Sequence, residues 1–198
     1  MKILHIISSP RGESSSSTRL GKEIVEKLQQ ENPNSELFLN DLNKDPFPHL
    51  NEVHLNSFFT PAENRSPELL EAVKQSDLAI QEIKNADVIV IDSPMYNFGI
   101  PSGLKSWIDH IARAGHTFRY TESGPEGMVT GKKVYLSIST GGIYAGPMQA
   151  YDFTESYLRG VLGFLGMTDV TTFRVEGTSV PGIKDEAFEK AVESIILN

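Results

Sequence analysis

Residues 87–98 read DVIVIDSPMYNF, and this stretch decides the fold class. Its first part, at 88–91, is an uninterrupted run of β-branched apolar residues. Such a run is typical of a central parallel strand that is covered on both faces. Apolar residues at helical spacing follow at 102–112, so the chain passes from a buried strand through a loop into a helix. This succession is the repeating unit of an α/β fold.

The chain on either side of this stretch repeats the same alternation. We expect further strands at 2–7, 36–40, 133–138 and 168–176, and further helices at 18–31, 67–85, 150–165 and 185–197. The succession predicts a three-layer sandwich, in which a five-stranded parallel sheet carries helices on both faces. Five strands fit the order 2-1-3-4-5, in which ligands bind beyond the carboxyl ends of the strands, near the switch point between strands 1 and 3. Two long connections, at 41–65 and 114–131, are predicted to be functional excursions.

Length and composition narrow the classes of function. The 198 residues suit a single domain spanning 1–198. The formal net charge of −8, without a basic run, argues against nucleic acids and anionic membrane surfaces as partners. No stretch approaches the roughly 20 apolar residues of a membrane span. The chain has no cysteine, which removes disulfides, thiolate nucleophiles and cysteine-ligated iron–sulfur clusters and is compatible with a cytoplasmic location.

The loop after the first predicted strand is rich in serine. Residues 8–18 read SSPRGESSSST and lead into the amino terminus of a helix. Free backbone N–H groups and the positive end of the helix dipole attract phosphate there, and serine hydroxyls add donors without bulk. The loop lacks the lysine and the spacing of a nucleoside-triphosphate loop. At this position in the fold we interpret it as a phosphate site, although a flexible serine-rich turn would explain the same residues elsewhere.

The loops after the third and fourth predicted strands also have unusual compositions. At 94–105, PMYNFGIPSGLK places Tyr96 and Phe98 beside exposed amides, which suits a flat heteroaromatic ring. An ordinary turn whose aromatic residues belong to the core explains this loop equally well. At 139–142, STGG has adjacent glycines that let the backbone approach a ligand closely. Alone it is a weak signal, and its value lies in its predicted position beside the other two loops.

The histidines and the carboxylates near the predicted strands do not indicate a metal or catalytic centre. His5 falls inside the first strand, where we expect a core or near-core residue. Asp92 and Asp109 are interpreted as structural. The remaining histidines are His49, His54, His110 and His116. Their spacing is not that of a zinc site, so we predict no metal.

Beyond these loops, the chain resembles a known family over nearly its full length. The most specific part is PMYNF at 94–98, followed after a helix by RAGHTFRYTESGPEG at 113–127. On these motifs the sequence is similar to the FMN-dependent NADH:quinone oxidoreductases known as azoreductases, within the flavodoxin-like superfamily. The resemblance implies bound FMN, NADH or NADPH as electron donor, and quinones and aromatic azo compounds as acceptors. It also implies a homodimer whose active sites lie near the subunit interface.

The same resemblance places the cofactor-binding residues. In the family an early serine and a later serine cluster hold the FMN phosphate and ribityl chain, and these correspond here to Ser9, Ser15, Ser16 and Ser17. The segment along the isoalloxazine ring corresponds to Met95, Tyr96, Asn97 and Phe98, and the Gly-Gly loop to Ser139, Thr140, Gly141 and Gly142. Many relatives carry arginine where this chain has Thr140, which leaves the effect of this position on the flavin potential open.

The activity that the resemblance implies is a ping-pong reaction. NAD(P)H passes hydride to N5 of the flavin and leaves, and a flat acceptor then takes two electrons and a proton in the same space. The resemblance also implies two-electron reduction of quinones and reductive cleavage of aromatic azo compounds to amines. The protein supplies position and electrostatics, so no catalytic side chain is predicted. Backbone N–H groups at Gly141 and Gly142 are expected to stabilise negative charge on the reduced ring. Tyr120 and Tyr144 are interpreted either as walls of the acceptor pocket or as packed surface aromatics.

Two other functions fit the same architecture. A flavodoxin-type electron carrier would bind FMN without nicotinamide chemistry of its own, but the serine loop is unlike the compact Thr-x-Thr-Gly pattern of that class. A flavin-free regulatory or scaffold domain is open as well, because fold does not fix function. The excursion at 41–65 either caps a pocket or enters a dimer interface with its aromatic residues Phe47, Phe58 and Phe59.

Overall fold

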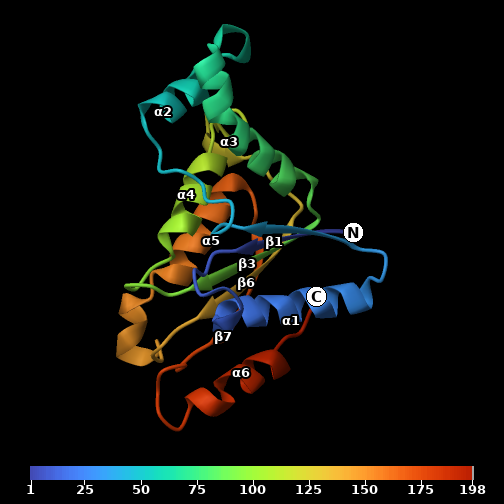
Figure 1. Ribbon diagram of the computed structural model, residues 1–198, viewed down its shortest axis with the longest axis vertical. Coiled ribbons are helices and arrows are strands. Elements are labelled where there is room, and N and C mark those ends of the chain that lie inside the picture. The colour runs from blue at the N-terminus through green and yellow to red at the C-terminus, as the bar shows by residue number, and fades with distance from the viewer. Residues whose placement is uncertain (198) are drawn as a thin grey trace.

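The computed structural model describes residues 1–197 and contains the predicted parallel sheet (Figure 1). Its five strands are β1 (Lys2–Ile7), β2 (Glu36–Asp41), β3 (Val88–Pro94), β6 (Lys133–Ser139) and β7 (Asp169–Val175). They lie in the order β2-β1-β3-β6-β7, and every neighbouring pair is parallel. This is the predicted 2-1-3-4-5 arrangement, so the expected switch point between β1 and β3 is confirmed.

Helices cover both faces of the sheet. α1 (Ser16–Glu31) and α6 (Lys184–Glu193) lie on one face, and α3 (Pro67–Asn85), α4 (Ser102–Ile111) and α5 (Thr154–Leu165) lie on the other (Figure 1). Because successive side chains of a strand point to opposite faces of the sheet, the core is divided into two clusters, one on each face. Ile3 and Val90 pack with α1, while Leu4 and Ile89 belong to the cluster that includes α4 and α5. Every residue of β3 is buried, as a central parallel strand requires.

The start of α3 follows from its capping residues. The Ser66 hydroxyl accepts a hydrogen bond from the N–H of Leu69, and Pro67 occupies the first helical position. Because proline lacks the N–H group that the first turn leaves unpaired, it stabilises the helix start. The helix predicted at 67–85 is therefore confirmed at both ends.

Two predicted helices lack four residues at one end in the structure. α5 begins at Thr154 instead of 150, because residues 146–151 form a 3-10 helix first and the Asp152 carboxylate then accepts the N–H of Thr154. α6 ends at Glu193 instead of 197. Conversely, β3 extends beyond 91 to Pro94, where it still pairs with β6.

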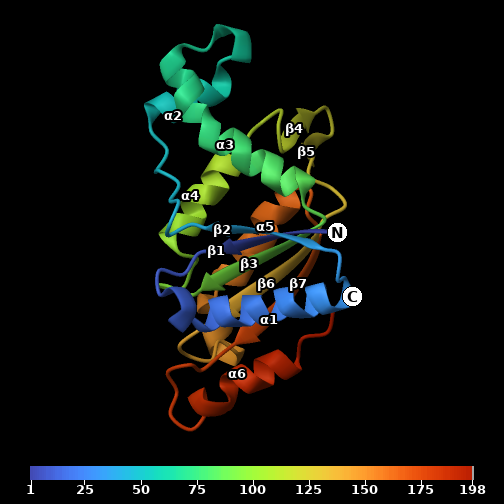
Figure 2. The same cartoon turned by 45° about the vertical axis from the view of Figure 1, so that its right-hand side comes forward.

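Both predicted excursions contain ordered structure. The first holds α2 (Glu52–Phe59), which packs against α3. The second holds a hairpin of β4 (Phe118–Thr121) and β5 (Gly124–Gly127). Figure 2 shows both on the side of the sheet that α3 covers. Neither excursion joins the central sheet.

The aromatic residues of the first excursion have different surroundings. Phe47 belongs to the core and packs against His110, with ring centroids 5.4 Å apart. Phe58 contacts the same imidazole and covers the guanidinium of Arg113. Phe59, by contrast, is 80% exposed. Phe47 and Phe58 thus anchor the excursion to the rest of the chain, whereas Phe59 is left exposed.

Within residues 1–197, no helix combines the length and apolar character that crossing a membrane requires. The histidine and acidic side chains of the same range form no group of three or more suited to a metal ion.

Candidate functional site

Loops from four strand ends meet at one hollow, which lies at the carboxyl ends of the strands. Its volume is about 190 Å³. The lining comes from the loops after β1, β3, β6 and β7, namely Arg11, Ser15, Ser16, Pro94, Met95, Tyr96, Ser139, Thr140, Gly141, Thr178 and Ser179. The three loops that the sequence singled out therefore converge. Their meeting point beside β1 and β3 is the switch point at which ligands bind in sheets of this order.

The amino terminus of α1 faces this hollow. Ser16 is the first helical residue, and within the described chain no side chain caps the helix. The N–H groups of its first turn are consequently free to bind a ligand. Ser15 and Ser16 line the hollow, and the Thr18 hydroxyl is buried without a partner among residues 1–197. Free N–H groups, hydroxyls and the positive end of the helix dipole together fit a phosphate.

Ser9 and Ser17 are placed differently from the other two serines. Both are fully buried, and the lining of the hollow does not include them. The Ser9 hydroxyl accepts the N–H of Arg11, and the Ser17 hydroxyl pairs with that of Ser15 at 3.0 Å. The Ser17 carbonyl accepts a hydrogen bond from Ser137 of β6. These two serines shape the loop, and direct contact with a phosphate stays a prediction for them.

The second loop has a strained backbone. Tyr96 and Gly99 exchange two backbone hydrogen bonds, of 2.9 and 3.1 Å. The residues between them, Asn97 and Phe98, have positive φ angles of 49° and 69°. This is the geometry of a type I′ turn, which favours asparagine or glycine and costs a residue such as Phe98 about 1 kcal/mol or more. Strain of this kind clusters at ligand sites, where surrounding contacts maintain it.

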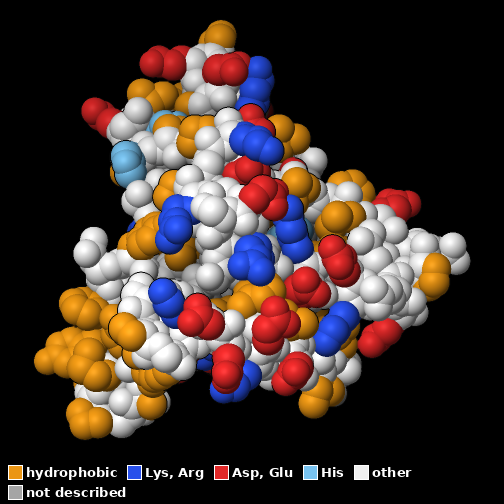
Figure 3. Space-filling view, turned by 60° about the horizontal axis from the view of Figure 1, so that its bottom comes forward, with side chains coloured by type: hydrophobic (Ala, Val, Ile, Leu, Met, Phe, Trp, Pro, Cys, Tyr) orange, Lys and Arg blue, Asp and Glu red, His pale blue; other side chains and the backbone are white. Residues whose placement is uncertain are grey.

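Aromatic side chains gather at this turn, although Phe98, Tyr144 and Tyr151 lie outside the lining of the hollow. Tyr96 lines the hollow, and Phe98 lies next to Tyr144 and Tyr151, with ring centroids 6.4 and 5.6 Å apart. Figure 3 shows hydrophobic side chains gathered at one edge of the molecule, on the side where the loop after β3 and the segment before α5 lie in Figure 1. A flat heteroaromatic ring would cover this surface. The sequence predicted aromatic surface here, although it missed Tyr151.

The third loop contributes backbone groups. Its base is joined to the second loop, because the Met95 N–H donates to the Ser139 carbonyl at 2.8 Å. The carbonyls of Gly141 and Gly142 accept hydrogen bonds from the loop after β7. Neither glycine N–H has an acceptor among the described residues, so both remain free to bind a ligand.

Thr140 is buried and turned toward its own loop. Its hydroxyl donates to the Gly142 carbonyl at 2.8 Å. Its carbonyl accepts hydrogen bonds from both the N–H and the hydroxyl of Thr178. The side chain therefore maintains the shape of the loop and brings no charge to the hollow.

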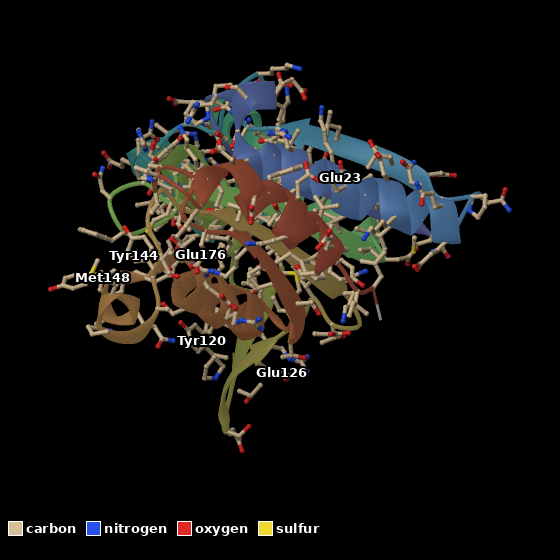
Figure 4. All side chains as sticks on the ribbon, turned by 90° about the horizontal axis from the view of Figure 1, so that it is seen from below. Glu23, Tyr120, Glu126, Tyr144, Met148 and Glu176 are labelled. Carbon is tan, nitrogen blue, oxygen red and sulfur yellow. The ribbon has the colours of Figure 1, made fainter. Side chains whose placement is uncertain are left out.

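Two parts of the lining of the hollow were not predicted from the sequence. Arg11 and the pair Thr178 and Ser179 line the hollow without having been singled out. A signal existed, because polar residues after a fifth parallel strand fall at the same sheet edge. Tyr120 lies on β4, outside the lining of the hollow, and is 74% exposed. Figure 4 shows it on the hairpin side of the molecule and Tyr144 on the loop side, so a role for Tyr120 at the acceptor stays a prediction.

A buried carboxyl–imidazole pair lies beneath the amino-terminal half of α1. His5 Nε2 and Asp92 Oδ2 are 2.9 Å apart, and both side chains are inaccessible. Burial raises the pKa of Asp92 to about 6, and the attraction of His5 offsets only part of that rise. His5 is thus the core residue that the sequence predicted. The pair supports the loops from below and does not line the hollow.

The fold and the site together define a class of protein. The free N–H groups and hydroxyls at the α1 terminus fit a phosphate, and the aromatic turn with the neighbouring glycine amides fits a heteroaromatic ring. Both lie at the switch point of a parallel sheet of order 2-1-3-4-5. This combination is that of a flavodoxin-like flavoprotein.

Comparisons with known proteins agree with this class. The flavodoxin-like fold family matches residues 1–196. An FMN-dependent NADH:quinone oxidoreductase of Herminiimonas arsenicoxydans is 49% identical over 180 residues, which covers 90% of this chain and 88% of the relative. One of Mesorhizobium japonicum is 45% identical over 197 residues, covering 98% and 94%. This chain therefore belongs to the family of FMN-dependent NADH:quinone oxidoreductases, and the resemblance indicated by its motifs is confirmed.

Solved structures support the same assignment. An azoreductase from Bacillus anthracis superposes with a TM-score of 0.91 at 29% identity and covers 98% of this chain and 95% of that one. An FMN-dependent NADH-azoreductase of the same species, in complex with FMN, superposes with a TM-score of 0.86 at 27% identity and covers 98% and 96%.

Proposed function

We propose that this chain is an FMN-dependent NADH:quinone oxidoreductase that reduces quinones by two electrons and cleaves aromatic azo compounds to amines. The observation that carries the proposal is the convergence of a phosphate-binding helix terminus, an aromatic turn and a Gly-Gly loop on one hollow. FMN, when bound, supplies the hydride-transfer chemistry between NADH and the acceptor. The names of the relatives support NADH as the donor.

Different residues of the chain bind different parts of the cofactor. The first-turn N–H groups of α1 and the hydroxyls of Ser15 and Ser16 bind the phosphate, while Ser9 and Ser17 support the loop from beneath. Residues 95–98 lie along the ring. The free N–H groups of the Gly-Gly loop donate to the ring edge and stabilise negative charge there, by the logic of an oxyanion hole.

We further infer that residues 1–198 form one FMN-binding domain and that the chain works as a homodimer. An apolar stripe along α5 supports the dimer, because Phe153, Tyr157, Gly160 and Phe164 recur at helical spacing and keep exposed surface. The Phe118 ring contacts both Phe164 and Tyr120, so Tyr120 lies beside this stripe. We also place the chain in the cytoplasm, where NADH is available as an electron donor.

The test of the function is a visible absorption spectrum of the protein loaded with FMN. Anaerobic NADH should bleach the flavin band, and a quinone should restore it. A chain that takes up no FMN would exclude the proposal. Flavin that only a partner reductase can reduce would instead identify an electron carrier of the flavodoxin type.

Ser16→Glu tests the placement of the phosphate. A carboxylate at the first residue of α1 would repel the phosphate, so the dissociation constant of FMN should rise about 100-fold. Quenching of FMN fluorescence measures it. Ser102→Glu is the matched control, because Ser102 is the exposed first residue of another helix, α4, outside the lining of the hollow. Equal FMN affinities in the two variants would mean that the phosphate binds elsewhere.

A further inference from the structure

A cluster of ion pairs lies beside the aromatic border of the proposed site. Arg174 of β7 is at its centre, and its guanidinium binds Asp152 at 2.5 Å, Glu155 at 3.0 Å and Glu176 at 3.0 Å. These side chains line a hollow of about 460 Å³ that Tyr144 also lines. Figure 4 shows Tyr144 and Glu176, which both belong to this lining, close together, with Met148 farther out. The cluster therefore touches the segment that carries the aromatic rings.

Residues 143–153 connect this cluster with the strained turn. At the end of the segment Asp152 binds Arg174, and the next residue, Phe153, donates its N–H to the Phe98 carbonyl at 3.0 Å. The other carboxylate oxygen of Asp152 accepts a backbone N–H at the start of α5. Two successive residues thus tie the segment to β7 on one side and to the turn on the other.

The aromatic rings of this segment depend on that attachment. Tyr144 and Tyr151 both contact the ring of Phe98. Every residue of the 3-10 helix at 146–151 is exposed, so apolar burial contributes little to its position. Polar contacts at 152–153 therefore have to hold the segment in place.

We propose that Arg174 is a positioning residue for the acceptor site. Through Asp152 it holds residues 143–153 against the turn, so that Tyr144 and Tyr151 present their rings to a flat acceptor. Arginine suits this role because its planar fork of donors serves several carboxylates at once, whereas a lysine ammonium acts as a point charge. The effect on the acceptor rests on the proposed function, and the attachment itself does not.

Amide hydrogen exchange in the FMN-free chain tests the attachment. Arg174→Gln and Asp152→Asn each remove the contact between β7 and the segment. Exchange of the Phe153 N–H should then become about tenfold faster or more, because its bond to the Phe98 carbonyl opens more often. Unchanged exchange at Phe153 in both variants would overturn the proposal.

Arg159→Gln is the matched control for charge. Arg159 also binds Glu155, but it makes its other hydrogen bonds to Val170 and Thr172 rather than to residues 143–153. Exchange of the Phe153 N–H should stay within about twofold of the wild type in this variant. An equal acceleration in Arg159→Gln would show that any loss of charge loosens this region and would overturn the specific role of Arg174.

Steady-state kinetics of the FMN-loaded protein tests the role at the acceptor. Arg174→Gln should raise KM for a benzoquinone about tenfold, while kcat falls by less than about threefold. Arg174→Lys keeps one ion pair and should lie between the wild type and Arg174→Gln. FMN affinity should hardly change, because the phosphate end lies at α1. A purely structural Arg174 would lower kcat, FMN affinity and Tm together at unchanged KM, and this result would overturn the proposal.

The two kinds of failure are distinguishable. A wild-type protein that binds FMN but reduces no quinone would reject the proposed function and, with it, the role of Arg174 at the acceptor. The positioning role alone would be rejected by a different set of results. The wild type would be active, Arg174→Gln would have the same KM, and the Phe153 N–H would exchange no faster in Arg174→Gln or Asp152→Asn than in the wild type.

Discussion

Gly21 permits the close approach of α1 to the sheet beneath the site. A Cβ at this position would stand 1.8 Å from Oδ1 of Asp92. The Asp92 side chain cannot move aside, because it is buried and its carboxylate is hydrogen-bonded to His5. The loops at the hollow lie at the ends of α1 and β3. The absence of a side chain at Gly21 therefore helps to determine where α1 begins beside β3.

Gly21→Ala should lower the free energy of unfolding by about 3 kcal/mol, the upper range for overpacking a core. In an Asp92→Ala background the same change should instead raise the free energy of unfolding by up to about 1 kcal/mol, because the clash is gone and a helix favours alanine over glycine by about that amount. Urea unfolding of the four proteins completes this double-mutant cycle. Equal costs in both backgrounds would show that the clash is not with Asp92.

The pKa of Asp92 predicts how stability depends on pH. Burial raises this pKa to about 6 in the native protein, whereas an aspartate in the unfolded chain has a pKa of about 3.9. Between about pH 4 and pH 6 the native state therefore holds a proton that the unfolded chain has lost, so the free energy of unfolding falls as pH rises. Two pKa units correspond to about 3 kcal/mol.

Asp92→Asn should remove this contribution. The difference in unfolding free energy, wild type minus variant, should fall by about 3 kcal/mol between about pH 4 and pH 7 and stay level above that range. Urea unfolding at several pH values measures the difference, in which contributions from groups far from residue 92 cancel. Parallel stability curves would mean that Asp92 titrates at an ordinary pKa.

At the scale of single residues, the sequence predicted which residues lie near the site better than it predicted what each of them contacts. Ser15 and Ser16 were expected at the phosphate and line the hollow, because the strand–loop–helix unit places them at a helix terminus. Ser17 was expected beside them, yet its hydroxyl pairs with Ser15 and its carbonyl binds a strand. The direction of each serine depends on where the helix begins, and the sequence placed that point at 18 rather than 16.

At the scale of elements, the corner of α2, α3 and α4 contains a buried guanidinium. The Arg113 side chain is 1% exposed, and its NH1 binds Asp77 at 2.5 Å and Ser76 at 2.8 Å. Asp77, the counter-ion, is 40% exposed. Loss of the carboxylate would leave a buried charge alone, whereas loss of the guanidinium would leave a carboxylate that water reaches. The two partners are therefore not equivalent.

Asp77→Ala should cost about 3 kcal/mol of unfolding free energy, because it leaves the charge of Arg113 buried without a counter-ion. Arg113→Met should cost less, since Asp77 becomes solvated. Urea unfolding ranks the two variants, and Glu126→Ala, which breaks an exposed ion pair with Arg119 on the hairpin, should leave the midpoint unchanged. A larger loss in Arg113→Met would contradict the electrostatic argument.

The excursions show why some elements escape prediction. α2 has a capping box, but its third position holds His54, whose Nδ1 accepts a hydrogen bond from the Asn51 N–H. Glutamate or glutamine is the usual signal at that position. Contacts far along the chain, such as Phe58 over Arg113, hold the helix in place. Helices and strands with a periodic apolar pattern could be predicted, because that pattern lies within the sequence of each element.

At the scale of the whole molecule, the sheet order placed the site before any contact was known. A parallel sheet of order 2-1-3-4-5 brings the loops after its first, third and fourth strands to one edge. Ser15 and Gly141 therefore line the same hollow although they are far apart in the sequence. The order says nothing about how residues 143–153 or the hairpin fold back, since these segments carry no periodic pattern. For this reason Tyr151 was missed, and Tyr120, for which an acceptor wall and a packed surface aromatic were both open, lies outside the lining of the hollow.

The stripe on α5 predicts which face the proposed homodimer uses. Gly160 is exposed within it, and a Cβ there would meet nothing within 4 Å, so Gly160→Arg should fold normally. In a dimer packed on this stripe, a buried unpaired guanidinium should raise the dissociation constant about 100-fold, or about 3 kcal/mol. Sedimentation equilibrium measures it, with Leu39→Arg on the exposed edge strand β2 as the matched control. A dimer that survives Gly160→Arg but dissociates with Leu39→Arg would place the interface at β2, and a monomeric wild type would end the homodimer proposal.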